Sequence, residues 1–313
     1  MPIKIPNDLP ASKILKEENI FVMDETRALS QRIRPLKLII VNIMPTKIVT
    51  ETQLLRLLSN TPLQIEVDWL CMESHNSKNT SQEHLMEFYK TFNEIKDNKY
   101  DGLIVTGAPV EKLKFEDVDY WDELTNIFDW ANTNVFSSFF ICWASQASLY
   151  YYYGVEKYQL KEKLTGVYHH HTNPEKMRRR ILRGFDYQFY APHSRYTSVK
   201  KEDIEKIDSL DILASSNDAG VYLVAEKDGS RFFVTGHPEY DPDTLDKEYH
   251  RDLAKCGDCV MPKNYYKNDD VNDEILVKWR SHAYLLFSNW LNYYVYQSTP
   301  YNLDDLEKMK TPQ

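Results

Sequence analysis

The stretch FFICWASQASLYYYYG, residues 139–154, joins an aromatic and aliphatic run to a segment with helical character, and Cys142 stands at the junction. The apolar run over 135–141 is typical of a buried strand, and a helix is expected to begin at Trp143. A strand that passes directly into a helix places Cys142 at the carboxyl end of that strand. Whether Cys142 packs or reacts depends on what the rest of the chain brings to the same place.

The segments before this junction alternate between strand and helix patterns. Strands that alternate with helices of this length indicate βαβ units and an α/β fold with a doubly wound, mostly parallel sheet flanked by helices. Ligands bind such sheets at the carboxyl ends of the strands, where Cys142 and the turn at 106–109 are both expected. The predicted strands are 37–44, 63–70, 102–106 and 135–141, and the predicted helices are 46–60, 81–96 and 117–131.

The second half of the chain is less regular. Residues 227–230, KDGS, are expected to form a hairpin turn, a helix is expected to begin at Asp241 or Asp243, and an aromatic-rich helix is expected over about 272–297. Residues 1–35 are polar without a clear period, which predicts an arm that packs on the body or on a partner subunit. Residues 36–313 are expected to form a single catalytic domain. The strands predicted in this half are 181–190, 211–216, 221–226 and 231–235.

Composition argues against several classes of protein. The 313 residues carry a formal net charge of −9, which disfavours nucleic acid or an anionic membrane as partner. The chain contains no apolar run of membrane-spanning length and its first residues do not resemble a signal peptide, so we expect a cytoplasmic protein. Four cysteines do not form a disulfide framework in so long a chain. No metal site is expected, because the C-x-x-C at 256–259 has no second pair and the histidines at 169–171, expected at the surface, lack further ligands at suitable spacing.

The case for a reactive Cys142 depends on a partner further along the chain. A lone buried cysteine is usually a small hydrophobe, but a helix N-terminus favours a thiolate. His237 and Glu239 follow another predicted strand, and alternating side chains place both on one side if the segment is extended. The carboxylate could then orient the imidazole while the other ring nitrogen faces the thiol. The alternative is a turn histidine beside a solvated glutamate.

A strand–Cys–helix segment and a strand–His-x-Glu segment in one α/β chain resemble the triad of class I glutamine amidotransferases. Their usual elbow reads G-x-C-x-G. The matching residues 140–144 are FICWA, so both glycines are absent, which disfavours glutamine hydrolysis.

A closer resemblance, over nearly the whole chain, is to the homoserine O-acyltransferases of the amidotransferase-like type. That family's elbow normally reads C-W-G-A-Q-A, and residues 142–147 here read CWASQA. The other motifs that carry the resemblance are NIMPTK at 42–47, TQLLRLL at 52–58, TGAPVE at 106–111, APHSRY at 191–196, GHPEYD at 236–241 and WRSHA at 279–283.

The resemblance implies a two-step acyl transfer with ping-pong kinetics and no cofactor beyond an acyl-CoA co-substrate. Cys142 would attack the thioester, with His237 as the base and Glu239 orienting the ring. Backbone N–H groups of Trp143 and of the 107–110 turn would stabilise the oxyanion. Homoserine would then attack the acyl-cysteine.

The resemblance also assigns substrate contacts. Lys163 and Ser194 match the family's substrate-binding residues, and Arg251 matches the residue that holds the carboxylate of the amino acid. Glu248, three residues earlier, could bind the ammonium group; without the family match, an intrahelical Glu248–Arg251 ion pair is the simpler interpretation. Lys47 could line the same pocket, with an exposed helix lysine as the alternative.

Glu111 matches the position that accompanies acyl selectivity, where glycine goes with succinyl and glutamate with acetyl transfer. A glutamate would repel the terminal carboxylate of a succinyl group, so a homoserine O-acetyltransferase of methionine biosynthesis is expected, with homoserine and acetyl-CoA as substrates. A succinyltransferase is the near alternative, with Glu111 then pointing to solvent. A glutamine amidotransferase and a non-catalytic thiol-bearing binding or redox-sensing protein are alternatives from other classes. The family further implies a homodimer.

Overall fold

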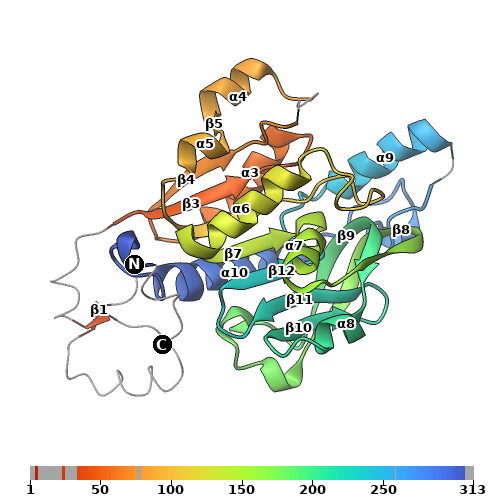
Figure 1. Cartoon of the computed structure of the whole chain (residues 1–313). Coiled ribbons are helices and arrows are strands. Elements are labelled where there is room, and N and C mark those ends of the chain that lie inside the picture. Colours follow the sequence, from red (N-terminus) through yellow and green to blue (C-terminus); the bar gives the residue numbers. More distant parts are fainter. Residues whose placement is uncertain (1–3, 6–22, 25–33, 76–78, 258, 307–313) are drawn as a thin grey trace.

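The computed structural model describes residues 4–5, 23–24, 34–75, 79–257 and 259–306. Its main feature is a ten-stranded sheet in the order β5-β4-β3-β6-β7-β12-β11-β10-β8-β9 (Figure 1). Two short strands, β1 (Lys4–Ile5) and β2 (Met23–Asp24), pair in parallel elsewhere. Most of the predicted arm at 1–35 lies outside the described residues.

The first six strands of the sheet order are all parallel: β5 (Tyr89–Lys90), β4 (Ile65–Leu70), β3 (Leu36–Val41), β6 (Tyr100–Val105), β7 (Val135–Ile141) and β12 (Arg231–Val234). The remaining four are antiparallel: β11 (Gly220–Glu226), β10 (Leu210–Ser216), β8 (Lys157–Thr172) and β9 (Gln188–Val199). The predicted parallel α/β sheet is therefore present, extended by an antiparallel half.

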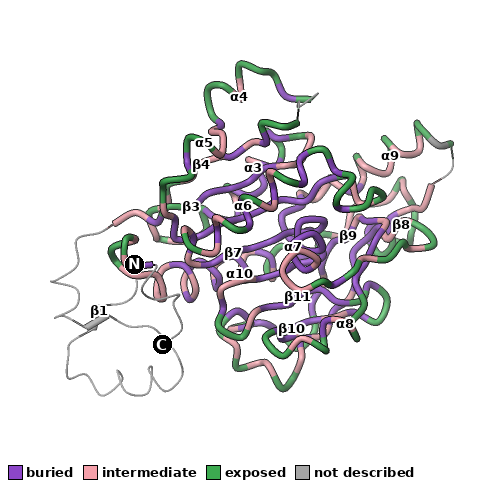
Figure 2. The backbone as a smooth tube through the Cα atoms, viewed as in Figure 1, coloured by how far each residue is buried: buried purple, intermediate pink, exposed green. Residues whose placement is uncertain are grey.

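Helices cover both faces of the parallel half. Ile39 and Val41 point to a core shared with α6 (Trp121–Asn134) and α7 (Trp143–Tyr153). Leu38 and Ile40 point to the opposite core, shared with α3 (Lys47–Leu58) and α10 (Arg280–Trp290). This alternation explains why the strands read as continuous apolar runs, since a strand buried on both faces has no polar side. Figure 2 shows the buried residues concentrated along the central strands and α7.

The predicted helix at 81–96 is interrupted. It consists of α4 (Gln82–Phe88), the edge strand β5 and α5 (Phe92–Ile95). Tyr89 is buried and its hydroxyl donates to Glu51 (2.6 Å), while Thr91 and Glu94 form a capping box that begins the new helix. Pairing with β4 at the sheet edge therefore overrides the helical pattern.

The predicted strand at 181–190 is wrong over its first half. Ile181 and Leu182 belong to the short 3₁₀ helix η2 (Arg180–Leu182) and pack in the core with α10, and β9 begins only at Gln188. The strand β8 was not predicted at all, because its first half is polar and exposed. The remaining helical segments are η1 (Pro174–Lys176), α8 (Lys201–Glu205), α9 (Thr244–Cys256), η3 (Lys267–Asp269), the π-helical η4 (Leu291–Tyr296) and η5 (Leu303–Asp305).

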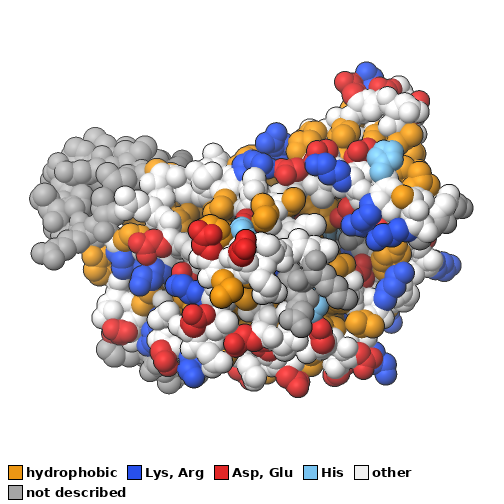
Figure 3. All heavy atoms as spheres, turned by 90° about the horizontal axis from the view of Figure 1, so that it is seen from above, with side chains coloured by type: hydrophobic (Ala, Val, Ile, Leu, Met, Phe, Trp, Pro, Cys, Tyr) orange, Lys and Arg blue, Asp and Glu red, His pale blue; other side chains and the backbone are white. Residues whose placement is uncertain are grey.

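The long C-terminal helix begins later than its aromatic pattern predicts. Residues 272–279 precede it, and Ile275 bridges to Tyr266 instead of starting the helix, which begins at Arg280. Among the described residues, no helix combines the length and the apolar character that a membrane crossing requires. On the face shown in Figure 3, cationic and anionic side chains are interspersed.

Candidate active site

Three neighbouring parallel strands, β6, β7 and β12, end at the same edge of the sheet. Cys142 follows β7 directly and precedes α7 with a backbone φ of +51°, in the left-handed region that non-glycine residues seldom adopt. Its N–H donates to the carbonyl of Val234 on β12 (2.7 Å), and Ser145 Oγ donates to its carbonyl (2.6 Å). The predicted sharp strand–helix elbow is present, held by bonds from both sides.

The turn after β6 lies against this elbow. A methyl group added at Gly107 would lie 3.3 Å from Cys142 Cβ and 3.4 Å from His237 Cε1, so the backbone here passes close to both side chains. Trp143 opens α7, and the first N–H groups of a helix have no partner within the helix. The N-terminus of α7 and the backbone of the neighbouring turn thus both adjoin Cys142.

His237 and Glu239 follow β12 at the same edge. His237 Nδ1 and Glu239 Oε1 are 2.7 Å apart, and the two side chains are only 4% and 5% exposed. The imidazole also interacts with the Cys142 sulfur, and because Nδ1 is occupied by Glu239, Nε2 is the nitrogen left to face it. The alternative of a turn histidine beside a solvated glutamate is wrong. The structure brings the predicted cysteine, histidine and glutamate together.

Electrostatics at this triad favour an imidazolium. Burial opposes a charge on His237, but the Cys142 sulfur and the Glu239 carboxylate, together with their hydrogen bonds, raise its pKa well above the ordinary value. Glu239 Oε2 is buried and has no hydrogen-bond partner among the described residues. A cationic ring beside a thiol is the environment in which cysteine acts as a nucleophile.

Close packing fixes the position of His237. The backbone N–H of His237 donates to the carbonyl of Pro192 on β9 (2.9 Å). A methyl group on Gly236 would lie 2.8 Å from that same carbonyl oxygen, closer than real contacts allow. The glycine before the histidine is therefore required by the approach of β9.

The predicted substrate residues form a second group around Glu248. Ser194 Oγ donates to Glu248 Oε2 (2.5 Å), and Lys163 Nζ lies 3.5 Å from the same oxygen. Arg251 does not form the intrahelical pair with Glu248 that the simpler interpretation expected. Its guanidinium contacts Asp252 (2.8 and 3.0 Å).

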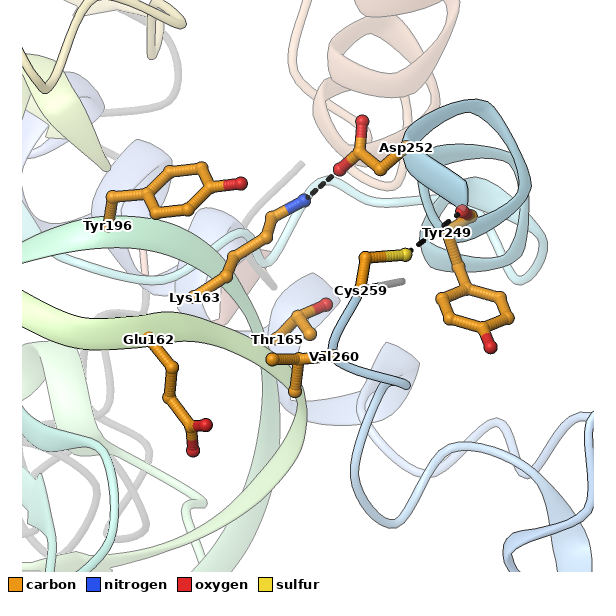
Figure 4. Close-up of a pocket in the computed structure, with 8 residues that line it drawn as sticks. All are labelled: Glu162, Lys163, Thr165, Tyr196, Tyr249, Asp252, Cys259 and Val260. Atoms are coloured by element: carbon orange, nitrogen blue, oxygen red, sulfur yellow. Dashed lines mark hydrogen bonds and ion pairs between the residues drawn. The ribbon is translucent and has the colours of Figure 1, made fainter. Parts of the chain in front are cut away.

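Asp252 is a site residue that sequence reasoning missed. Its carboxylate also accepts from Lys163 Nζ (2.8 Å), so it joins two of the predicted substrate-binding cations. The signal available in the sequence was its place four residues after Glu248, one helical turn along the same face. Figure 4 shows the Lys163 ammonium group and the Asp252 carboxylate pointing toward each other. Both line a pocket of about 200 Å³, whose walls are Glu162, Lys163, Thr165, Tyr196, Tyr249, Asp252, Cys259 and Val260.

Glu111 lies past the turn that contacts Cys142. It is half-buried, and its carbonyl accepts from Lys157 Nζ (2.7 Å). Lys47 is only 6% exposed, so the exposed-lysine alternative is wrong. Its Nζ donates to the carbonyl of Asn42, and burial lowers its pKa.

The histidines at 169–171 are not all at the surface, because His170 is fully buried. Its Nε2 lies 3.0 Å from Nε2 of His193, whose Nδ1 contacts the buried Arg195. No group of three or more potential ligands with a metal-binding arrangement occurs within the described part of the chain. The side chain of Cys256, half of the C-x-x-C pair, lies outside the described residues.

Comparison with known proteins identifies the family. The sequence model of the family described as homoserine O-succinyltransferase matches residues 2–301. The chain belongs to this family. A relative from Catenibacterium mitsuokai is 72% identical over 99% of this chain and 100% of its own length, and one from Petrotoga mobilis is 59% identical over 98% and 99%; both are named homoserine O-acetyltransferase.

Solved structures show the same fold at much lower identity. A glutamine amidotransferase from Thermotoga maritima matches with a TM-score of 0.53 and 12% identity, over 82% of this chain and 97% of its own. The predicted class I amidotransferase-like fold is thereby confirmed. Within the homoserine O-succinyltransferase family, the family description and the names of these relatives differ in the acyl group, so the donor must be argued from the site.

Proposed function

We propose that this chain transfers the acetyl group of acetyl-CoA to the γ-hydroxyl of L-homoserine through an acyl-cysteine, giving O-acetyl-L-homoserine and CoA. The observation that carries the proposal is the buried Cys142–His237–Glu239 arrangement at the carboxyl edge of the sheet. The high identity to relatives named homoserine O-acetyltransferase supports it.

In the first step the Cys142 thiolate attacks the thioester carbonyl of acetyl-CoA. The N–H of Trp143 and those of the 107–110 turn stabilise the oxyanion that forms. Collapse of this intermediate breaks the bond to sulfur of CoA, which leaves as a thiol after His237 supplies the proton. The enzyme is then acetylated on Cys142, with His237 neutral.

In the second step homoserine enters the site of the departed CoA thiol. His237 Nε2 accepts the proton of the γ-hydroxyl as its oxygen attacks the acyl carbon, and Glu239 stabilises the imidazolium that results. The second tetrahedral intermediate expels the Cys142 thiolate, which restores the starting ion pair. The proton that the Cys142–His237 pair gives to CoA in the first step is regained from homoserine in the second, and ping-pong kinetics follow.

The second group of residues supplies the contacts for the amino acid. Glu248 would bind the ammonium group, and Lys163, Ser194 and Arg251 would hold the carboxylate end. Arg251 is more than half exposed and pairs with Asp252 here, so it must exchange this partner to bind a substrate carboxylate.

Glu111 favours the acetyl donor. A succinyl carboxylate about 4 Å from the Glu111 carboxylate would be repelled by roughly 4 kcal/mol at an effective dielectric near 20. Lys157 beside the Glu111 backbone offsets part of this repulsion. Even about one quarter of this repulsion would give a several-fold preference for acetyl-CoA over succinyl-CoA.

The setting of the reaction follows from its product. The product, O-acetylhomoserine, implies a role in methionine biosynthesis. We propose a cytoplasmic enzyme that acts, as the family resemblance implies, as a homodimer. The mechanism uses no cofactor or metal, with acetyl-CoA as co-substrate. Light scattering of the purified chain tests the dimer, for which a mass of twice 37.0 kDa is expected.

The deciding experiment incubates the purified protein with homoserine and either acetyl-CoA or succinyl-CoA and follows free thiol. Thiol release is expected to be several-fold faster with acetyl-CoA and to be lost in Cys142→Ala. Acetyl-CoA without homoserine should give one equivalent of thiol per site, from acylation of Cys142.

Each contrary result rejects a different part of the proposal. A faster reaction with succinyl-CoA would reject the Glu111 argument and leave the acyltransferase. Release of thiol by Cys142→Ala at the rate of the unmodified protein would reject the acyl-cysteine. No release with either donor, together with ammonia formation from glutamine, would assign the chain to amide hydrolysis.

A further inference from the structure

The residue after the GHPE motif, Tyr240, contacts both halves of the site. Its ring stacks on the imidazole of His237 with centroids 4.1 Å apart and planes inclined by 19°. Its hydroxyl donates to Glu248 Oε1 (2.8 Å), the carboxylate assigned to the homoserine ammonium group. A single side chain therefore spans the distance from the base to the amino-acid subsite.

The backbone of Tyr240 is anchored as firmly as its side chain. Its N–H donates to the carbonyl of His237 (3.3 Å), and its own carbonyl accepts from the indole N–H of Trp279 (3.1 Å). The residue is 5% exposed. With only two side-chain torsions, both fixed by packing, the ring acts as a rigid spacer between His237 and Glu248.

The ring supports the charge on the imidazole. Glu239 holds the His237 ring at Nδ1, the Cys142 sulfur interacts with the imidazole, and Tyr240 covers one of its faces. An aromatic face within 6 Å of a cation attracts it, most strongly where water is excluded. The stacking therefore stabilises the imidazolium of the thiolate–imidazolium pair.

The hydroxyl orients the Glu248 carboxylate. Oε1 accepts from Tyr240 and Oε2 from Ser194. A carboxylate offers about four lone-pair directions, so two neutral donors fix its plane and leave acceptor capacity for an ammonium group. Burial and the neighbouring carboxylate raise the pKa of Tyr240 well above its ordinary value, which keeps the hydroxyl a donor throughout the working pH range.

We propose that Tyr240 is a positioning residue with two separable roles: its ring holds and stabilises the imidazolium of His237, and its hydroxyl sets the carboxylate that binds the homoserine ammonium. Through these two contacts one side chain sets the base and the ammonium subsite relative to each other. This inference rests on the proposed function for the identity of the amino acid.

Two variants separate the roles. Tyr240→Phe keeps the ring and removes the hydroxyl, so KM for homoserine should rise about tenfold, the loss typical of one hydrogen bond to a charged group, while KM for acetyl-CoA changes less than twofold. Tyr240→Leu removes the ring. The upper inflection in the pH dependence of Cys142 alkylation by iodoacetamide, which reports loss of the imidazolium proton, should fall by about one pH unit.

The matched control is Tyr152→Phe, which deletes another hydroxyl, one that donates to the Phe128 carbonyl (2.7 Å) on α6. It should show the original KM values and alkylation profile. An unchanged KM for homoserine in Tyr240→Phe overturns the role of the hydroxyl, and an unchanged upper inflection in Tyr240→Leu overturns the role of the ring.

Alkylation and homoserine binding can be measured without acyl transfer, which separates this inference from the proposed function. Calorimetric titration of homoserine into Cys142→Ala, with and without Tyr240→Phe, should show about tenfold weaker binding in the double variant. If Tyr240→Leu does not fold, this titration still decides the role of the hydroxyl. Equal affinities would reject it, and lack of thiol release from acetyl-CoA by the unmodified protein would reject the acyltransferase instead.

Discussion

At the scale of single residues, Glu111 offers the sharpest test of charge. Glu111→Gln keeps the size of the side chain and removes the charge that repels a succinyl carboxylate. The ratio of kcat/KM for succinyl-CoA to that for acetyl-CoA is expected to rise about tenfold, which corresponds to about 1.4 kcal/mol of removed repulsion. Initial rates of thiol release with each donor give the ratio.

The control for this measurement is Glu116→Gln, five residues further along the same segment. Its carboxylate accepts from the hydroxyl of Tyr150 and is exposed, so the donor ratio should stay within twofold of the original. An equal change in both variants would attribute the effect to net charge and contradict a specific role for Glu111.

Sequence predicted some residues of the site and not others, for physical reasons. Cys142, His237 and Glu239 could be predicted because each follows a strand end, and period-2 spacing puts His237 and Glu239 on one side. The family motifs then linked the cysteine to the histidine, which lies 95 positions further along the chain. Tyr240 and Asp252 belong to the site through contacts with Glu248 and Lys163, which only the folded chain provides. The burial of Lys47 likewise depends on neighbours from distant segments.

At the scale of elements, the sequence predicted best where a strand is buried on both faces. The strand at 135–141 was predicted with the bounds that β7 has, and the core of β3 was also recovered. Prediction from the sequence failed for β8. The first half of this strand is exposed and pairs only with β9, so neither alternation nor an apolar run marks it. The interruption at β5 shows the same limit, because the sheet edge that selects it is remote in sequence.

The β8–β9 hairpin contains a chain of hydrogen bonds that should make the fold sensitive to acid. Arg195 can only donate to His193 Nδ1, so the Nε2–H of His193 donates to His170 Nε2, and the Nδ1–H of His170 donates to the Tyr168 carbonyl (2.9 Å). Both rings are therefore neutral. Burial lowers the pKa of His170 to about 3, although its bond to the carbonyl opposes the shift.

The sign of the effect on stability follows from this lowered pKa. Below pH 6.5 the unfolded chain binds a proton at His170 that the folded chain does not bind until about pH 3, so the free energy of unfolding falls as pH falls through this range. The free energy of unfolding, measured with urea between pH 7 and pH 4.5, should depend less steeply on pH in His170→Gln than in the unmodified protein, by about 1.4 kcal/mol per pH unit. The amide oxygen of the glutamine can still accept from His193. Parallel slopes would mean that His170 is protonated in the folded protein.

At the scale of the whole molecule, one side chain ties distant parts of the chain to the centre of the sheet. Arg34 precedes β3 and donates to both oxygens of Asp101 at the start of β6 (2.6 and 2.8 Å), and also to the carbonyl of Pro300 (3.4 Å). Asp101 is fully buried and accepts a further bond from the N–H of Lys37 (2.7 Å). This anchor lies at the amino end of β6, opposite the edge that holds Cys142.

Removing the guanidinium should therefore weaken the fold without changing the chemistry. Arg34→Ala leaves a buried carboxylate without its cation, for which the expected loss in the free energy of unfolding is about 3 kcal/mol. The kcat of thiol release at 25 °C should change less than twofold, because the site at the other end of the strands is untouched. Urea denaturation followed by tryptophan fluorescence measures the loss. The control is Lys206→Ala, which removes an exposed pair with Asp203 and should leave the urea midpoint nearly unchanged. If the two variants lost equal stability, Asp101 would be satisfied without Arg34, and the link between the chain before β3, the sheet and residue 300 would contribute little to the fold.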